Sequence, residues 1–158
     1  TAKRRVYLVT IPHPRSAVGS TIQGPLRCPD DLSHADIEAA FSDAFAHPEY
    51  ADAGNARWQE LHGTPNTTLV RMVIFREFHA RPGGAPAGEP RDAHYHVAIL
   101  VSSPCRFMAY KRALHLRHGL ATHWSTSHDG YWSVVRYGFM ATPKKPQAEL
   151  DKSPRAWP

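Results

Sequence analysis

The chain has 158 residues, of which 42% are apolar, so it is long enough for one domain with a hydrophobic core. Lysine and arginine exceed aspartate and glutamate by 19 − 14 = 5, a balance that favours an anionic partner such as nucleic acid without requiring one. The two cysteines, Cys28 and Cys105, exclude a disulfide framework and a zinc finger with paired cysteines. We therefore expect a reducing intracellular compartment, which would be the nucleus in a eukaryotic host. No stretch approaches the roughly 20 apolar residues of a membrane span, so we expect no membrane partner.

The first half of the chain predicts a strand, a long loop and a helix. A β-rich run at residues 6–11 stops at Pro12, and residues 12–32 are rich in proline and glycine. Ser33, with Asp36 three residues later, is typical of a helix N-cap. Apolar side chains then recur at helical spacing through residues 34–46, and Pro48 ends this helix. The apolar stripe consists of Ile37, Ala40, Phe41, Ala44 and Phe45.

The second half predicts two long strands followed by alternating helices and a short strand. We expect strands at residues 67–78 and 94–102, joined by a proline- and glycine-rich loop over 80–93. A helix is expected over 104–118 between Ser103-Pro104 and Gly119, then a short strand at 121–125, a helix at 129–140 and an extended tail. This order predicts an α+β fold, a central antiparallel sheet of about five strands with helices over one face.

The sharpest local pattern is His94-Tyr95-His96 at the start of the clearest strand. Residues i and i+2 of a strand point to the same face, so both imidazoles project side by side. Glu77 stands near the end of the preceding strand and is the preferred third ligand, with His79 as a competitor. Two histidines and a carboxylate suit Mg²⁺ or Mn²⁺ acting as a Lewis acid on a phosphodiester. A chance His-x-His is the alternative in a chain with 11 histidines.

Tyr137 is the candidate nucleophile among the six tyrosines. We expect Trp132, Val135 and Phe139 to form the apolar stripe of its helix, which leaves Tyr137 off the stripe and able to face a site. A phenol attacks phosphorus well only when a metal and a cation stabilise the developing charge. Lys144 and Lys145 follow closely enough to supply that cation. The alternative is a half-buried packing tyrosine.

Three motifs in chain order resemble those of the HUH endonucleases, the rolling-circle Rep nickases. The run from Tyr7 to Pro12 resembles the first motif of geminivirus-type Rep proteins. Arg76-Glu77-Phe78-His79, followed by the His94 and His96 pair, resembles their second, and Tyr137 stands where the third carries its tyrosine. The stretch from Tyr137 through Lys144 and Lys145 to Trp157 is closer still to the HUH proteins of replitron-type transposons. The resemblance spans roughly residues 6–146.

The resemblance implies a single HUH domain over residues 1–158, which we expect to be part of a longer transposon- or replicon-encoded protein. It implies a ferredoxin- or RRM-like sheet, with Glu77, His94 and His96 as the ligands of Mn²⁺ or Mg²⁺. It further implies that the domain, expected to be monomeric, binds single-stranded DNA in a sequence-specific manner, with or without a hairpin. Tyr137 would then cut one strand, remain linked to the 5′ phosphate and leave a free 3′ hydroxyl, and the reverse reaction would join strands.

Cationic and aromatic side chains supply candidate DNA contacts, because single-strand grooves combine phosphate tracking with base stacking. The candidates are Lys3, Arg4 and Arg5 beside the first strand, Arg76, His79 and His123 near the metal ligands, and Trp124 as a stacking residue. Further cations lie on the second helix (Lys111, Arg112, Arg117), and Tyr131 and Trp132 precede Tyr137. A solvated surface is the alternative for each charge, and a core position for each tryptophan.

Two other functions compete with the nickase. A mononuclear metal oxygenase also uses His-x-His with a carboxylate, but it predicts many short, evenly spaced strands and needs no tyrosine. A nucleic-acid-binding module with a structural metal predicts binding without cleavage.

Overall fold

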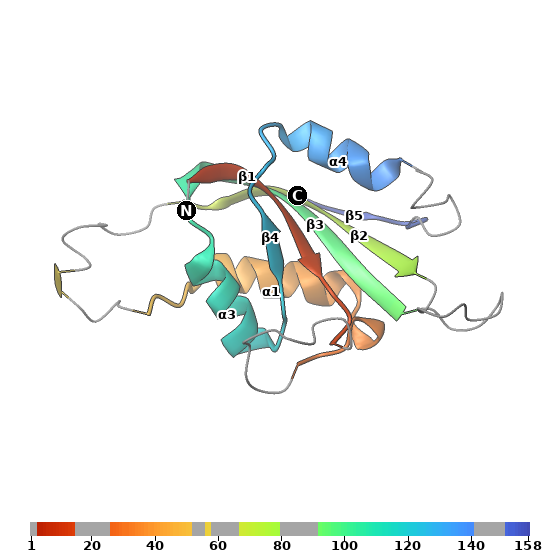
Figure 1. Cartoon of the computed structure of the whole chain (residues 1–158), viewed down its shortest axis with the longest axis horizontal. Coiled ribbons are helices and arrows are strands. Elements are labelled where there is room, and N and C mark those ends of the chain that lie inside the picture. Colours follow the sequence, from red (N-terminus) through yellow and green to blue (C-terminus); the bar gives the residue numbers. More distant parts are fainter. Residues whose placement is uncertain (1–2, 15–25, 52–55, 58–66, 80–91, 141–150) are drawn as a thin grey trace.

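The computed structural model describes residues 3–14, 26–51, 56–57, 67–79, 92–140 and 151–158, with residues 78, 79 and 92 described by their backbone. Among these residues, no helix has both the length and the apolar character that a membrane span requires. The described part forms one antiparallel sheet with helices packed on it, which confirms the α+β class (Figure 1).

The sheet has five strands in the order β4-β1-β3-β2-β5, and all neighbours are antiparallel. Two long strands, β2 (Leu69–His79) and β3 (Asp92–Cys105), lie at its centre with β1 (Arg4–Ile11). The short strands β4 (His123–Ser125) and β5 (Arg155–Trp157) form the edges. The C-terminal tail, expected to be merely extended, thus adds an edge strand beside β2.

One face of the sheet is covered by α1 (His34–Ala46) and α3 (Met108–His118). The predicted N-cap of α1 is present and forms a capping box, because Ser33 Oγ accepts from Asp36 N while Asp36 Oδ2 accepts from Ser33 N. All five residues of the predicted α1 stripe are buried. Alternate β3 residues complete this core: Tyr95, Val97, Ile99 and Val101. Burial of an apolar side chain typically stabilises the folded state by about 1.5–3 kcal/mol.

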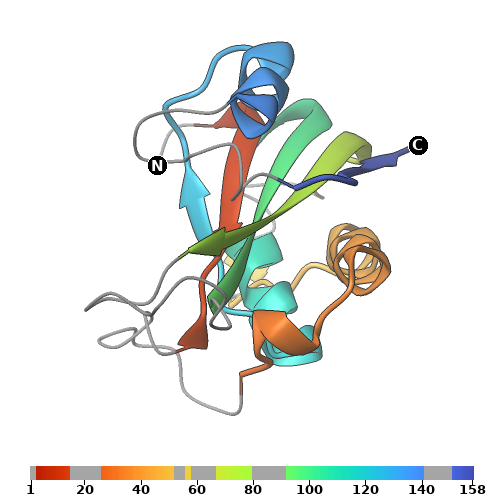
Figure 2. The same ribbon diagram turned by 90° about the vertical axis from the view of Figure 1, so that its right-hand side faces the viewer.

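The other face carries α4 (Tyr131–Phe139), as Figures 1 and 2 both show. A second, smaller core forms there from Val6, Val73 and Phe75 of the strands with Val134 and Val135 of the helix. The expectation that the helices cover one face is therefore wrong. Two helices build the main core on one side, and α4 lies alone on the opposite side.

The start of α3 also differs from the sequence-based expectation. Pro104 was expected to open the helix, but β3 continues to Cys105, which pairs with Arg4 of β1. The helix begins only at Met108 and ends, as predicted, at Gly119, whose φ of 64° favours glycine. Pairing with a neighbouring strand has thus prevailed over the local helix signal.

Candidate metal centre

Glu77, His94 and His96 come together on the α4 face of the sheet. His94 and His96 share that face with Ala98, which belongs to the smaller core under α4. Glu77 lies directly opposite His94 in the β2–β3 register. The long antiparallel pairing of two adjacent strands therefore places all three side chains at neighbouring positions.

The three ligand atoms form a compact triangle. His94 Nε2 lies 3.0 Å from Glu77 Oε2 and 3.0 Å from His96 Nε2, and His96 Nε2 lies 3.3 Å from Glu77 Oε2. The side chains are 3% exposed for Glu77, 13% for His94 and 16% for His96. The carboxylate is thus buried behind two imidazoles that keep limited access to solvent.

This triangle fits a divalent metal ion. An ion about 2.1 Å from three atoms on one face of an octahedron would hold those atoms about 3.0 Å apart. The observed separations of 3.0–3.3 Å match that geometry with little adjustment. One carboxylate and two neutral imidazoles leave positions open for substrate oxygens and water. The residues are therefore positioned to bind a metal, as the sequence predicted.

Thr10 of β1 orients one of these ligands, a role that no pattern in the sequence predicted. Its Oγ1 lies 3.0 Å from Nδ1 of His96. When Nε2 faces the metal position, Nδ1 carries the ring proton, and its N–H donates a hydrogen bond to Thr10 Oγ1. Thr10 and His96 are register partners, so only the strand pairing, which the sequence did not specify, could have revealed this contact.

The C-terminal half of α4 lies over β2 next to the triangle. Phe75 pairs with His96 across the sheet and stands two residues before Glu77 on the same face. Gly138 approaches the Phe75 ring so closely that a Cβ at this position would lie 2.5 Å from it. Phe139 meets the same ring edge to face at 5.2 Å between centroids. The residue immediately before these two is Tyr137.

The predicted apolar stripe of α4 is wrong in two of its three members. Trp132 and Phe139 are exposed, and the helix packs instead through Tyr131, Val134, Val135 and Gly138. Tyr137 does lie off the packed face, with 48% of its surface exposed. The buried face of α4 differs from the predicted stripe because Gly138, which has no side chain, packs against the sheet at this end of the helix.

The other residues expected beside Glu77, His94 and His96 (the triad) are divided between the two faces of the sheet. His123 is exposed and pairs with Thr10, so it lies in the row that includes His96. Arg76, in contrast, places its guanidinium 5.9 Å from the Tyr95 ring, on the α1 face and not beside the triad. Trp124 is 5% exposed and stacks on Phe107 within the main core, which corrects its assignment as a base-stacking residue.

The N-terminal cations lie at the start of β1, away from its His96-paired end. Lys3 is exposed, Arg4 reaches Asp129 at 3.4 Å, and Arg5 donates to the backbone oxygen of Val101. Three further predictions fall outside the described residues: Lys144, Lys145 and the side chain of His79.

Comparison of the chain with models of known protein families, with curated proteins and with solved structures finds no match.

Proposed function

We propose that this protein is a metal-dependent endonuclease of the HUH type, which cleaves and rejoins single-stranded DNA through Tyr137. The observation that supports the proposal is the sharing of one sheet face by the triad and the tyrosine-bearing helix. Phe75 links the two, because it contacts Gly138 and Phe139 of α4 and neighbours His96 and Glu77 in the sheet. The end of α4 that carries Tyr137 is thereby packed against the strand that carries Glu77.

The proposed reaction is a transesterification. The Tyr137 oxygen attacks phosphorus, a P–O bond to Tyr137 forms, and the bond to the 3′ oxygen breaks. The phenol proton is lost and the leaving oxygen gains one, so the products are a 5′-phosphotyrosine and a free 3′ hydroxyl. A bound Mg²⁺ or Mn²⁺ ion would supply Lewis acidity to the non-bridging oxygens. The covalent link conserves the energy of the phosphodiester, so a 3′ hydroxyl attacking it rejoins the strand.

The surface of α4 supports DNA as the substrate. Among the described residues, seven large apolar side chains are exposed, and four of them belong to this nine-residue helix and its C-cap. They are Trp132, Tyr137, Phe139 and Met140. Arg71 of β2 lies 5.7 Å from the Trp132 ring, and Arg136 is also exposed. Aromatic faces beside cations are what single-stranded nucleic acids require, since bases stack and phosphates need counter-charges.

The fold favours this proposal over an oxygenase. The oxygenase alternative predicts many short, evenly spaced strands, whereas the triad here stands on strands of 11 and 14 residues. A binding module with a structural metal would use the same triad and the same exposed aromatics. Cleavage is therefore the property that distinguishes the two remaining candidates.

The decisive experiment is a nicking assay on a diverse pool of labelled single-stranded oligonucleotides with Mn²⁺. We expect cleavage and a covalent protein–DNA adduct, both abolished by EDTA and by Tyr137→Phe. The matched control is Tyr50→Phe, because Tyr50 interacts with Tyr110 on the opposite side of the sheet. That variant should form the adduct at the wild-type rate.

A second variant separates catalysis from binding. His96→Ala should abolish cleavage and leave most of the DNA affinity, because phosphate contacts dominate affinity. Adduct formation by Tyr137→Phe would show that another residue is the nucleophile. Binding without cleavage by the wild-type protein across the whole pool would establish the binding module instead.

A further inference from the structure

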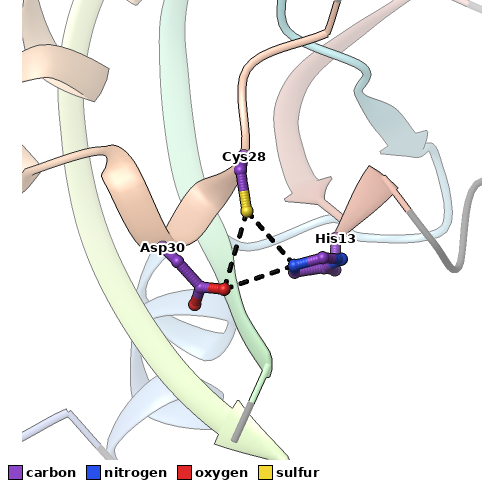
Figure 3. A group of neighbouring side chains, drawn as sticks. All are labelled: His13, Cys28 and Asp30. Carbon is purple, nitrogen blue, oxygen red and sulfur yellow. Dashed lines mark hydrogen bonds and ion pairs between the residues drawn. The ribbon is translucent and has the colours of Figure 1, made fainter. Parts of the chain in front are cut away.

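A second cluster of metal-binding side chains lies where β1 ends and β3 begins. His13 follows β1, while Cys28 and Asp30 flank the start of the short 3-10 helix η2 (Pro29–Asp31). Figure 3 shows the three side chains pointing toward one another. His13 Nε2 lies 3.1 Å from Cys28 Sγ and 3.2 Å from Asp30 Oδ2, and Sγ lies 3.5 Å from Oδ2. Neither the proposed cleavage reaction nor the triad uses these residues.

The separations fit tetrahedral zinc. Zinc–ligand bonds of about 2.0–2.3 Å at tetrahedral angles place the ligand atoms about 3.3–3.6 Å apart. The three observed distances, 3.1, 3.2 and 3.5 Å, approach that range, so a small outward movement of the side chains would admit the ion. Thiolate sulfur and imidazole nitrogen are ligands that zinc prefers and magnesium avoids.

The arrangement does not fit a nucleophilic cysteine with a histidine base. In such a site the nucleophile contacts one ring nitrogen and the carboxylate holds the other. Here both Cys28 Sγ and Asp30 Oδ2 approach the same nitrogen, Nε2 of His13. Three atoms that converge on one point are the pattern of a coordination site.

The backbone holds two of these ligands in place. The Oδ1 atom of Asp30 accepts from Ala93 N at 3.0 Å, which leaves Oδ2 to face the cluster as a single-oxygen ligand. The turn of η2 is closed by Asp31 N donating to Cys28 O at 2.9 Å. Arg27 N donates to Gly119 O, which anchors the same segment to the end of α3. Cys28 and Asp30 therefore belong to a segment that is hydrogen-bonded to both β3 and the end of α3.

We propose that His13, Cys28 and Asp30 bind a zinc ion through Nε2, Sγ and Oδ2, with water as the fourth ligand. Binding converts the Cys28 thiol to a thiolate and releases its proton to solvent. The ion ties the residue after β1 and the η2 segment to the start of β3. Because Asp30 holds Ala93, and His94 follows directly, the zinc site braces the end of β3 that carries His94 and His96.

Cobalt substitution tests the proposal without reference to DNA cleavage. The full chain is stripped with a chelator, titrated with Co²⁺ and followed by absorption. We expect a thiolate-to-cobalt charge-transfer band with tetrahedral ligand-field bands, saturating at one equivalent and displaced by Zn²⁺. The triad contains no sulfur, so this charge-transfer band reports on the Cys28 site alone. Cys28→Ala should abolish the band, and Asp30→Asn should weaken Co²⁺ binding by at least the roughly 10-fold that outer-shell substitutions cost.

Two controls make the assignment specific. Cys105→Ser should keep the band, because Cys105 ends β3 and is not part of the cluster. The double variant His94→Ala/His96→Ala should also keep it while losing the other metal equivalent. Absence of the band from the wild-type protein, or its persistence in folded Cys28→Ala, would overturn the proposal. Rapid alkylation of Cys28 by iodoacetamide, unaffected by saturating Zn²⁺, would do the same.

Discussion

The hydroxyl oxygen of Thr10 lies 3.0 Å from Nδ1 of His96, on the far side of the imidazole ring from Glu77. The ring is thereby held between two strands, with β1 fixing its orientation and β2 supplying the carboxylate. A metal ligand whose second nitrogen is hydrogen-bonded cannot rotate or change tautomer without losing that bond. Three strands, and not two, thus define the candidate metal centre.

Thr10→Val should weaken metal binding while leaving the fold intact. The valine keeps the shape of threonine but cannot accept the proton on Nδ1 of His96. Loss of such a contact typically costs 10–100-fold in affinity, so we expect a decrease of about that size in Mn²⁺ affinity by isothermal titration calorimetry. Thr10→Ser should bind as the wild type does. Equal affinity in the valine and serine variants would show that Thr10 does not orient His96.

Gly138→Ala should destabilise the protein, although alanine normally favours a helix. The gain in helix propensity is about 1 kcal/mol, whereas forcing a methyl group into a packed contact costs about 1–3 kcal/mol. The added Cβ would lie 2.5 Å from the Phe75 ring, so α4 must move. In a Phe75→Leu background the same change should become neutral or stabilising. Urea unfolding of the four proteins measures this, and the same sign in both backgrounds would disprove the contact.

Trp132→Ala should weaken binding of single-stranded DNA without affecting the metal centre. Stacking of a base on an aromatic side chain contributes about 1–3 kcal/mol, so we expect a loss of about 5–150-fold in affinity, measured by fluorescence anisotropy at fixed salt. Leu116→Ala is the matched control, because Leu116 is 64% exposed, close to the 66% of Trp132, but lies on α3 across the sheet. Equal losses of DNA affinity in both variants would show that the exposed side chains of α4 do not form the DNA-binding surface.

Acid should destabilise the protein partly through Asp43, which joins α1 to α3. Hydrogen bonds from Arg117, and then from His118, hold the pKa of its carboxyl below the usual value of 3.8, with His47 also in contact. A lowered pKa in the folded state stabilises the protein above pH 3.8, and this contribution is lost as the pH falls toward the folded-state pKa. The melting temperature of Asp43→Asn should therefore fall less steeply below about pH 4 than that of the wild type. Asp129→Asn, at a 93% exposed carboxylate, should follow the wild-type curve.

The sequence predicts much of this fold because its strongest signals are local. The Ser33–Asp36 cap and the stripe that follows it specify α1 to the residue. The i, i+2 spacing of His94 and His96, together with a hairpin from β2, brings Glu77 into place. Each of these features depends on residues close in sequence or on one simple pairing.

The remaining features depend on contacts between distant segments. The close approach of Gly138 to Phe75 decides which side of α4 is buried, and no property of the α4 sequence indicates it. Trp124 enters the core because β4 pairs with β1, which places Trp124 beside Tyr7, with ring centroids 5.3 Å apart. The η2 cluster requires residues 13 and 28 to meet at the start of β3. Neither the spacing of residues nor their secondary-structure propensity predicts these contacts between distant segments.

The side chains of β3 point alternately to the two faces of the sheet, and this alternation makes metal binding depend on the correct pairing of the strand. Tyr95 and Val97 fill the main core, whereas His94 and His96 face α4, so neighbouring residues serve stability and chemistry in turn. A slip of one residue in pairing would bury two imidazoles among apolar side chains and expose a tyrosine and a valine. Misregistered chains would lose their core and their metal ligands in the same event. The metal-binding capacity of a preparation thus counts the molecules whose central strand is correctly paired, and it serves as a measure of sample quality before any substrate is known.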